Sequence, residues 1–254
     1  MTLVVQTLHA SQTDPQRVVL LHGFTQNSAC WEPFAGLVAS LTGMEVVAVD
    51  APGHGRSPAV HDRADLWESA QLIGAAAGTG HYVGYSMGGR IALHLALAMP
   101  ELVRSLTLIG ATPGIADPAE RSRRLTADHA LADQLETIGV EPFVDRWLAQ
   151  PLFAKLQPEA AHREARLLNR VDGLAASLRH CGTGTQQDLR PQLLRITAPT
   201  MVVAGAEDAK FAAIGRELPG RLQLISGAGH SAHLEQPDVT ARLVAEFLAA
   251  TTIG

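Results

Sequence analysis

Ser86 lies at the centre of the segment Gly-Tyr-Ser-Met-Gly, which fits the pattern G-x-S-x-G. The apolar segment His81–Gly84 before it predicts a strand, and Met87–Met99 after it predicts a helix. In this context the pattern predicts a nucleophile elbow, a tight turn that presents the serine hydroxyl at the end of a strand. Gly84 and Gly88 are expected to be small because neighbouring backbone comes close. We therefore interpret Ser86 as the candidate catalytic nucleophile or base.

A catalytic serine needs a base, and the base needs an acid that orients it. In the fold that carries this elbow, the chain order is serine, acid, histidine. Asp208 follows the predicted strand Thr200–Ala204, and His230 follows the predicted strand Arg221–Ile225. Both lie at carboxyl ends of strands, where open α/β sheets place their sites. We assign Asp208 as the acid and His230 as the base.

Three neighbouring residues compete for these roles. Glu207 directly precedes Asp208, so the two side chains are expected to point apart. His233 stands where the last helix is expected to begin, and we expect it to cap or to pack. His54 lies in a glycine-rich turn and is expected to be structural.

A reaction that develops negative charge on oxygen needs two hydrogen-bond donors near it. The backbone amide of Met87, directly after the serine, is one candidate. The second is the amide of Phe24, in the loop that follows the predicted strand Arg17–Leu21. No spacing of His, Cys and Glu indicates a metal site, no dinucleotide fingerprint follows a strand, and no cofactor is expected.

Short apolar segments alternate with helical ones along most of the chain, which favours a mostly parallel α/β sheet flanked by helices. The first two strands are separated by the polar turn Ala10–Gln16, which favours an antiparallel hairpin at the sheet edge. Strands are predicted at Leu3–Leu8, Arg17–Leu21, Glu45–Val49, His81–Gly84, Ser105–Ile109, Thr200–Ala204 and Arg221–Ile225. Helices are predicted at Cys30–Leu41, Asp65–Ala77, Met87–Met99, Ala209–Leu218 and Pro237–Ala250.

One long segment breaks this alternation. Residues 113–198 have a helical period and contain no apolar strand, and we predict that they form a helical lid over the carboxyl edge of the sheet. Residues 1–112 and 199–254 would then form the core domain.

Composition limits the classes of function. The formal net charge of −5 disfavours a nucleic-acid binder. Two cysteines imply no disulfide framework and fit a reducing compartment. The first residues lack the basic start of a signal peptide, and no apolar segment is long enough to span a membrane. We expect a cytoplasmic protein without membrane or nucleic-acid partners.

Together these features resemble the α/β-hydrolase superfamily over essentially the whole chain. The elbow is also similar to that of 2-succinyl-6-hydroxy-2,4-cyclohexadiene-1-carboxylate synthase, a family of menaquinone biosynthesis. Further segments that carry this narrower resemblance are Glu120–Arg124, Phe143–Phe153, Gly182–Gln186 and Gly205–Phe211.

This resemblance implies a lyase, in which Ser86 abstracts a proton, pyruvate is eliminated and the oxyanion hole holds an enolate. It also implies a small anionic substrate whose carboxylates bind arginines, with aromatic side chains along its ring. Arg123 and Arg163 stay open as alternatives to the neighbouring arginines of this set. The substrate-binding residues that the resemblance implies are Tyr85, Arg90, Arg124, Trp147, Phe153 and Arg166.

Two other functions stay open. A carboxylic-ester or carbon–carbon hydrolase would use the same serine, histidine and aspartate, but through an acyl-enzyme. A binding protein on the same fold would have no need of all three residues, and the presence of Ser86, Asp208 and His230 argues against it.

Overall fold

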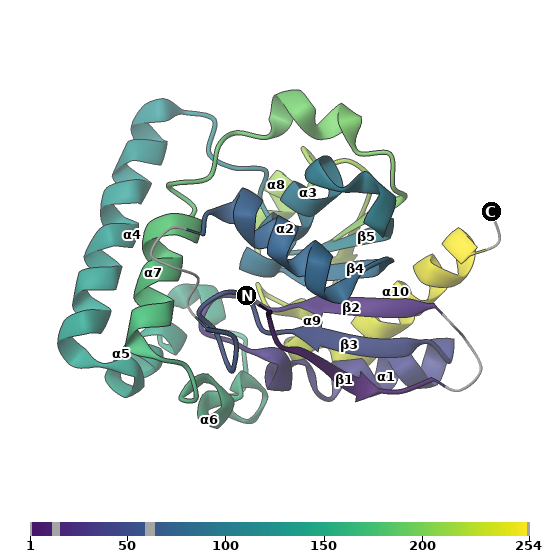
Figure 1. Ribbon diagram of the computed structural model, residues 1–254, viewed down its shortest axis with the longest axis horizontal. Helices are drawn as coiled ribbons and strands as arrows, with labels where there is room; N and C mark the ends of the chain where they lie inside the picture. The colour runs from purple at the N-terminus through teal and green to yellow at the C-terminus, as the bar shows by residue number, and fades with distance from the viewer. Residues whose placement is uncertain (1, 12–15, 59–63, 253–254) are drawn as a thin grey trace.

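The computed structural model describes residues 2–11, 16–58 and 64–252, and its centre is a seven-stranded sheet (Figure 1). The strand order is β1-β3-β2-β4-β5-β6-β7, and every pair is parallel except β1 with β3. The predicted mostly parallel sheet is confirmed. The strands are β1 (Val5–His9), β2 (Arg17–Leu21), β3 (Glu45–Val49), β4 (Gly80–Tyr85), β5 (Val103–Ile109), β6 (Thr200–Gly205) and β7 (Arg221–Ile225).

Helices cover both faces of the sheet (Figure 1). Side chains of α1 (Phe34–Thr42) and α10 (Pro237–Thr252) contribute to one buried apolar layer. Those of α2 (Leu66–Ala77) and α3 (Met87–Ala98) contribute to the other. Two further helices, α8 (Ala209–Gly215) and α9 (Ala232–Glu235), follow β6 and β7. The predicted α/β alternation is therefore confirmed.

The predicted hairpin between the first two strands was wrong. β1 pairs with β3, where Val5 lies opposite Val49, and β2 lies between β3 and β4. Residues 18–21 of β2 are fully buried and suit a central position, whereas β1 is only partly buried and suits an edge. Residues 12–15 of the predicted turn lie outside the described residues.

The helix predicted at Cys30–Leu41 is divided in two. A short 3₁₀ helix spans Ser28–Trp31, and α1 begins only at Phe34. Pro33 separates them, because proline has no amide hydrogen to continue a helix but is tolerated at its start.

The segment between β5 and β6 is helical, as predicted. It contains α4 (Pro118–Ile138), α5 (Val140–Leu148), α6 (Arg163–Arg166) and α7 (Val171–Cys181). These helices stand together at one end of the sheet (Figure 1), and α4, α5 and α7 enclose an apolar cluster of their own. We call residues 113–198 the insertion.

Candidate active site

Ser86 occupies a strained turn between β4 and α3. Its backbone has φ 49° and ψ −107°, which is rare for a residue with a side chain. A Cβ atom on Gly84 would lie 2.5 Å from the carbonyl oxygen of Gly88, and one on Gly88 would overlap the carbonyl of Leu21. The crowding that the sequence analysis expected at both glycines is therefore present.

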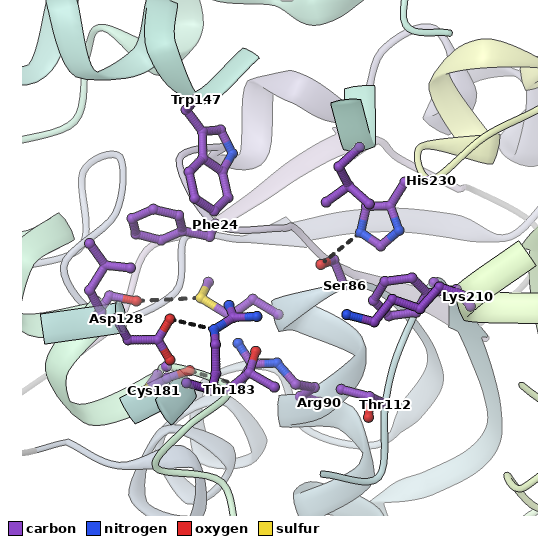
Figure 2. Close-up of a pocket in the computed structure, with 18 residues that line it drawn as sticks. Phe24, Ser86, Arg90, Thr112, Asp128, Trp147, Cys181, Thr183, Lys210 and His230 are labelled. Carbon is purple, nitrogen blue, oxygen red and sulfur yellow. Dashed lines mark hydrogen bonds and ion pairs between the residues drawn. The ribbon is translucent and has the colours of Figure 1, made fainter. Parts of the chain in front are cut away.

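Ser86, His230 and Asp208 form a chain of hydrogen bonds, part of which Figure 2 shows. His230 Nε2 lies 3.2 Å from Ser86 Oγ, and His230 Nδ1 lies 3.0 Å from Asp208 Oδ2. Asp208 Oδ1 also accepts a hydrogen bond of 3.1 Å from the amide of Phe211. With Asp208 ionised, the imidazole donates from Nδ1 and can accept the serine proton at Nε2.

The environment keeps Asp208 ionised. Partial burial raises the pKa of this carboxyl, but hydrogen bonds from His230 and the Phe211 amide outweigh it, and the net pKa lies below the ordinary value. The carboxylate therefore holds the imidazole in one tautomer at neutral pH.

A cavity of about 120 Å³ adjoins Ser86 and His230. Phe24 and Trp147 form one wall and pack edge to face, with ring centroids 5.0 Å apart (Figure 2). Met87 also lines the cavity. As the first residue of α3, it has an amide that no helical hydrogen bond uses. Both residues predicted for the oxyanion hole, Phe24 and Met87, therefore line the cavity that adjoins the serine.

Two arginines line the same cavity. Arg90 is buried and donates to the carbonyl of Cys181 at 2.7 Å, and among the described residues no carboxylate pairs with it. Burial lowers the pKa of Arg90 to about 10, which still leaves it charged at neutral pH. Arg124 donates from Nε to buried Asp128 at 2.7 Å, and among the described residues its terminal nitrogens make no hydrogen bond.

Lys210 is a further cation at this cavity, and the sequence analysis did not single it out. Figure 2 shows its side chain pointing toward the space beside Ser86. Lys210 also borders an adjoining cavity of about 480 Å³, together with Thr112, Arg124 and Thr183. The sequence could have indicated Lys210, because it lies in the first turn after Asp208 and that turn lies at the same edge of the sheet as this acid.

Three residues of the implied substrate set do not line the cavity. The hydroxyl of Tyr85 is bonded to Ser231 Oγ at 2.7 Å, and its ring packs against His233. Phe153 is buried beside Trp147 and His230. Arg166 is buried under the loop that carries Phe24. Arg90, Arg124 and Trp147 are the members of the set that reach the cavity.

The neighbouring residues that sequence reasoning weighed have other partners. Glu207 pairs with Lys155 at 2.5 Å, whereas Asp208 is the carboxylate bonded to His230. His54 is buried and bonds the carbonyl of Pro52. Arg163 pairs with Asp145 at the surface. Arg123 is exposed, one position from Arg124 on α4.

In the part of the chain that the structure describes, no group of three or more His, Cys, Asp or Glu residues is arranged to hold a metal ion. Nor does that part contain a helix with the length and hydropathy needed to cross a membrane. Cys30 and Cys181 are both free and buried.

The model of the alpha/beta hydrolase family matches residues 18–243, which include all three residues of the hydrogen-bonded chain. The chain belongs to the alpha/beta hydrolase family. Its geometry agrees, because the elbow and the order serine, aspartate, histidine are those of this fold.

Similar proteins within the family indicate a narrower group of enzymes. A 2-succinyl-6-hydroxy-2,4-cyclohexadiene-1-carboxylate synthase of Serratia proteamaculans (strain 568) is 33% identical over 97% of this chain and 98% of its own. A Bacillus subtilis (strain 168) protein that carries the same name provisionally is 35% identical over 92% of this chain and 90% of its own. The predicted resemblance to these synthases is confirmed, and the protein is an enzyme.

Solved structures show the same likeness at the level of the fold. The structure of MenH from S. aureus superposes with a TM-score of 0.88, is 29% identical and covers 99% of both chains. A thermophilic esterase from Thermogutta terrifontis superposes with a TM-score of 0.81 at 21% identity, over 98% of this chain and 93% of its own. The esterase likeness shows the fold alone.

His233 generates a first prediction. It is fully buried against Trp31 and Tyr85, and neither ring nitrogen has a hydrogen-bond partner among the described residues. Burial, together with nearby positive groups, lowers the pKa of His233 well below 6.5, so only the unfolded chain takes up a proton as pH falls below 6.5. His233→Phe should therefore stabilise the protein, by about 2 kcal/mol more at pH 5 than at pH 7.5.

Denaturant unfolding of the parent and the variant at the two pH values measures this difference. Because other histidines titrate equally in both proteins, the difference between them isolates His233. An equal difference at pH 5 and pH 7.5 would mean that His233 takes up its proton over the same pH range in the folded protein as in the unfolded chain.

Proposed function

We propose that the protein is a carbon–oxygen lyase of menaquinone biosynthesis. It would eliminate pyruvate from 2-succinyl-5-enolpyruvyl-6-hydroxy-3-cyclohexene-1-carboxylate to give 2-succinyl-6-hydroxy-2,4-cyclohexadiene-1-carboxylate. The observation that carries this proposal is a serine–histidine pair that opens onto a cavity lined by Arg90, Arg124 and Lys210. The relatives named as synthases support the same reaction.

In this reaction Ser86 acts as the base. His230 Nε2 takes the hydroxyl proton while Ser86 Oγ removes the proton from the ring carbon that bears the succinyl group. The electron pair forms a double bond in the ring, the existing double bond shifts, and the ring carbon–oxygen bond to the enolpyruvyl group breaks. The enolpyruvate that leaves takes up a proton and becomes pyruvate.

The oxyanion hole then has a defined task. Removal of the proton next to the succinyl ketone converts that ketone into an enolate, whose oxygen carries the negative charge. We propose that the amides of Phe24 and Met87 donate to this oxygen. Preorganised donors of this kind contribute about 3–4 kcal/mol to a transition state.

The charges of the cavity suit the substrate, which carries three carboxylates: one on the ring, one on the succinyl group and one on the enolpyruvyl group. Arg90, Arg124 and Lys210 are three cations at the cavity, and within the described part of the chain only Arg124 of the three is paired with a carboxylate. The cavity beside Ser86 measures only about 120 Å³, so we propose that the substrate extends past Lys210 into the adjoining cavity of about 480 Å³. The proposed substrate contacts are therefore Arg90, Arg124, Lys210 and Trp147.

The insertion completes this arrangement. Arg124 and Trp147 come from α4 and α5, so residues 113–198 supply one side of the proposed substrate site. We retain the proposal that this segment is a lid on a core of residues 1–112 and 199–254. The free cysteines support the proposal of a cytoplasmic enzyme, and a small anionic substrate is its only proposed partner.

A hydrolase is the second candidate, because the hydrogen bonds of Ser86 and His230 would equally support attack of the serine on a carbonyl. Arg90 and Lys210 disfavour it, because no carboxylate among the described residues pairs with them and a neutral ester does not compensate their charge.

Comparing pyruvate release with ester cleavage separates the two functions. The protein should release pyruvate rapidly from freshly made enolpyruvyl substrate and cleave nitrophenyl esters feebly. Ser86→Ala should lower pyruvate release by about 10³-fold or more while unfolding stays cooperative, because the proton acceptor is lost. Fast ester cleavage with slow pyruvate release would identify a hydrolase.

Lys210 and Lys155 are the only lysines of the chain and provide a matched pair. Lys210→Gln should raise KM for the enolpyruvyl substrate on the order of 10-fold, because a charged hydrogen bond to a carboxylate is lost. Lys155→Gln, which removes an exposed ion pair with Glu207, should leave KM within about 2-fold. Equal KM values in the two variants would exclude Lys210 from substrate binding.

A further inference from the structure

The loop that carries Phe24 contains a second strained residue. Residues 23–26 form a turn closed by a hydrogen bond of 3.1 Å from the amide of Gln26 to the carbonyl of Gly23. Thr25, its third residue, has φ 68°. A positive φ at this position of a turn favours glycine or asparagine, and a β-branched residue adopts it only when its surroundings hold it there.

This turn fixes the direction of the Phe24 amide. The carbonyl of Gly23 and the amide of Phe24 belong to the same planar peptide unit and point in opposite directions. The carbonyl accepts from Gln26 and also from His22 Nδ1 at 2.8 Å. The amide of Ala51 donates to His22 Nε2 at 3.0 Å, so the imidazole proton must lie on Nδ1. The Phe24 amide therefore faces away from these partners.

The insertion holds Thr25 through two side chains. Arg166 Nη1 donates to Thr25 Oγ1, and Asn169 Nδ2 donates to the carbonyl of Thr25 at 2.6 Å. All three residues are buried. The hydroxyl and the carbonyl of Thr25 are thus both hydrogen-bonded to residues 166–169 of the insertion.

That segment is itself rigidly held. Arg166 Nε donates to the carbonyl of Ala161 at 2.7 Å, and Asn169 Nδ2 also donates to the carbonyl of Arg166 at 2.9 Å. Asn169 Oδ1 accepts from the amide of Gly55 at 2.7 Å, which ties the segment to the core. The planar guanidinium reaches two acceptors at once, which a lysine could not do with the same geometry.

We propose that Arg166 and Asn169 are positioning residues that hold Thr25 in its left-handed conformation and thereby aim the Phe24 amide at the reacting oxygen. Arg166 then acts through the loop, in place of the direct substrate contact that the family resemblance implied. The inference rests on the proposed use of the Phe24 amide as an oxyanion donor.

Two nearly isosteric variants test it. Thr25→Val removes the acceptor for Arg166 and keeps the shape of the side chain. Asn169→Asp keeps the acceptor for the Gly55 amide and replaces the donor to Thr25 with an oxygen. Each should lower kcat for pyruvate release on the order of 10- to 100-fold with little change in KM, because a displaced oxyanion donor acts in the transition state.

Thr25→Ser and Arg170→Gln are the matched controls. The first keeps the acceptor for Arg166, and the second removes an exposed ion pair with Asp172 directly beside Asn169. Both should retain kcat within about 2-fold.

Hydrogen exchange of the peptide that covers residues 22–27 gives a readout independent of turnover. Exchange should be faster in Thr25→Val and Asn169→Asp, and unchanged in the two controls. If the parent protein released no pyruvate, the proposed function would fail while this exchange measurement still tested the contacts to Thr25.

Arg166→Lys separates positioning from substrate contact. A positioning role predicts a lower kcat for the enolpyruvyl substrate and an equally lower rate for neutral esters. A direct contact predicts a higher KM for the anionic substrate alone. The latter result, or unchanged kcat and exchange in Thr25→Val and Asn169→Asp, would overturn the inference.

Discussion

The site depends on the backbone conformation of Ser86. A residue with φ 49° at the end of β4 is unfavourable by itself, and such a conformation persists only where the surrounding structure holds it. Gly84 and Gly88 let the strand and helix α3 approach closely enough to form the turn. His230 and Asp208 can then reach the serine from β7 and β6, whose carboxyl ends lie at the same edge of the sheet.

Electrostatics supports the proposal that this acidic protein binds an anion. The net charge is −5, yet buried Arg90 has carbonyl oxygen as its partner instead of a carboxylate. A buried guanidinium without a counterion is costly, and an anionic ligand would offset that cost. Arg166 is also buried and bonded to neutral oxygens, but it lies beneath the Phe24 loop. Location, more than charge, therefore distinguishes Arg90, the proposed substrate contact, from Arg166, the proposed positioning residue.

Local sequence was sufficient for the parts of the fold that short-range physics determines. The elbow around Ser86 and the ends of β2, β3 and β7 follow from apolar periodicity and glycine spacing. The pairing of β1 with β3 did not follow, because strand order depends on which strand buries both faces. Arg166 could not be placed either, since its partner Thr25 is distant in sequence and only the folded insertion brings them together. Lys210 lies within the segment Gly205–Phe211 that carries the family resemblance. The direction of its side chain into the cavity, however, depends on the folded turn.

In the proposed mechanism Ser86 removes a proton and forms no covalent intermediate. The most direct test uses substrate that carries deuterium on the ring carbon bearing the succinyl group, with the mass of the protein recorded during turnover. We predict a primary isotope effect on pyruvate release and an unchanged protein mass, because proton removal by Ser86 adds no group to the protein. Pyruvate release without an isotope effect, together with an acyl group on Ser86, would contradict it.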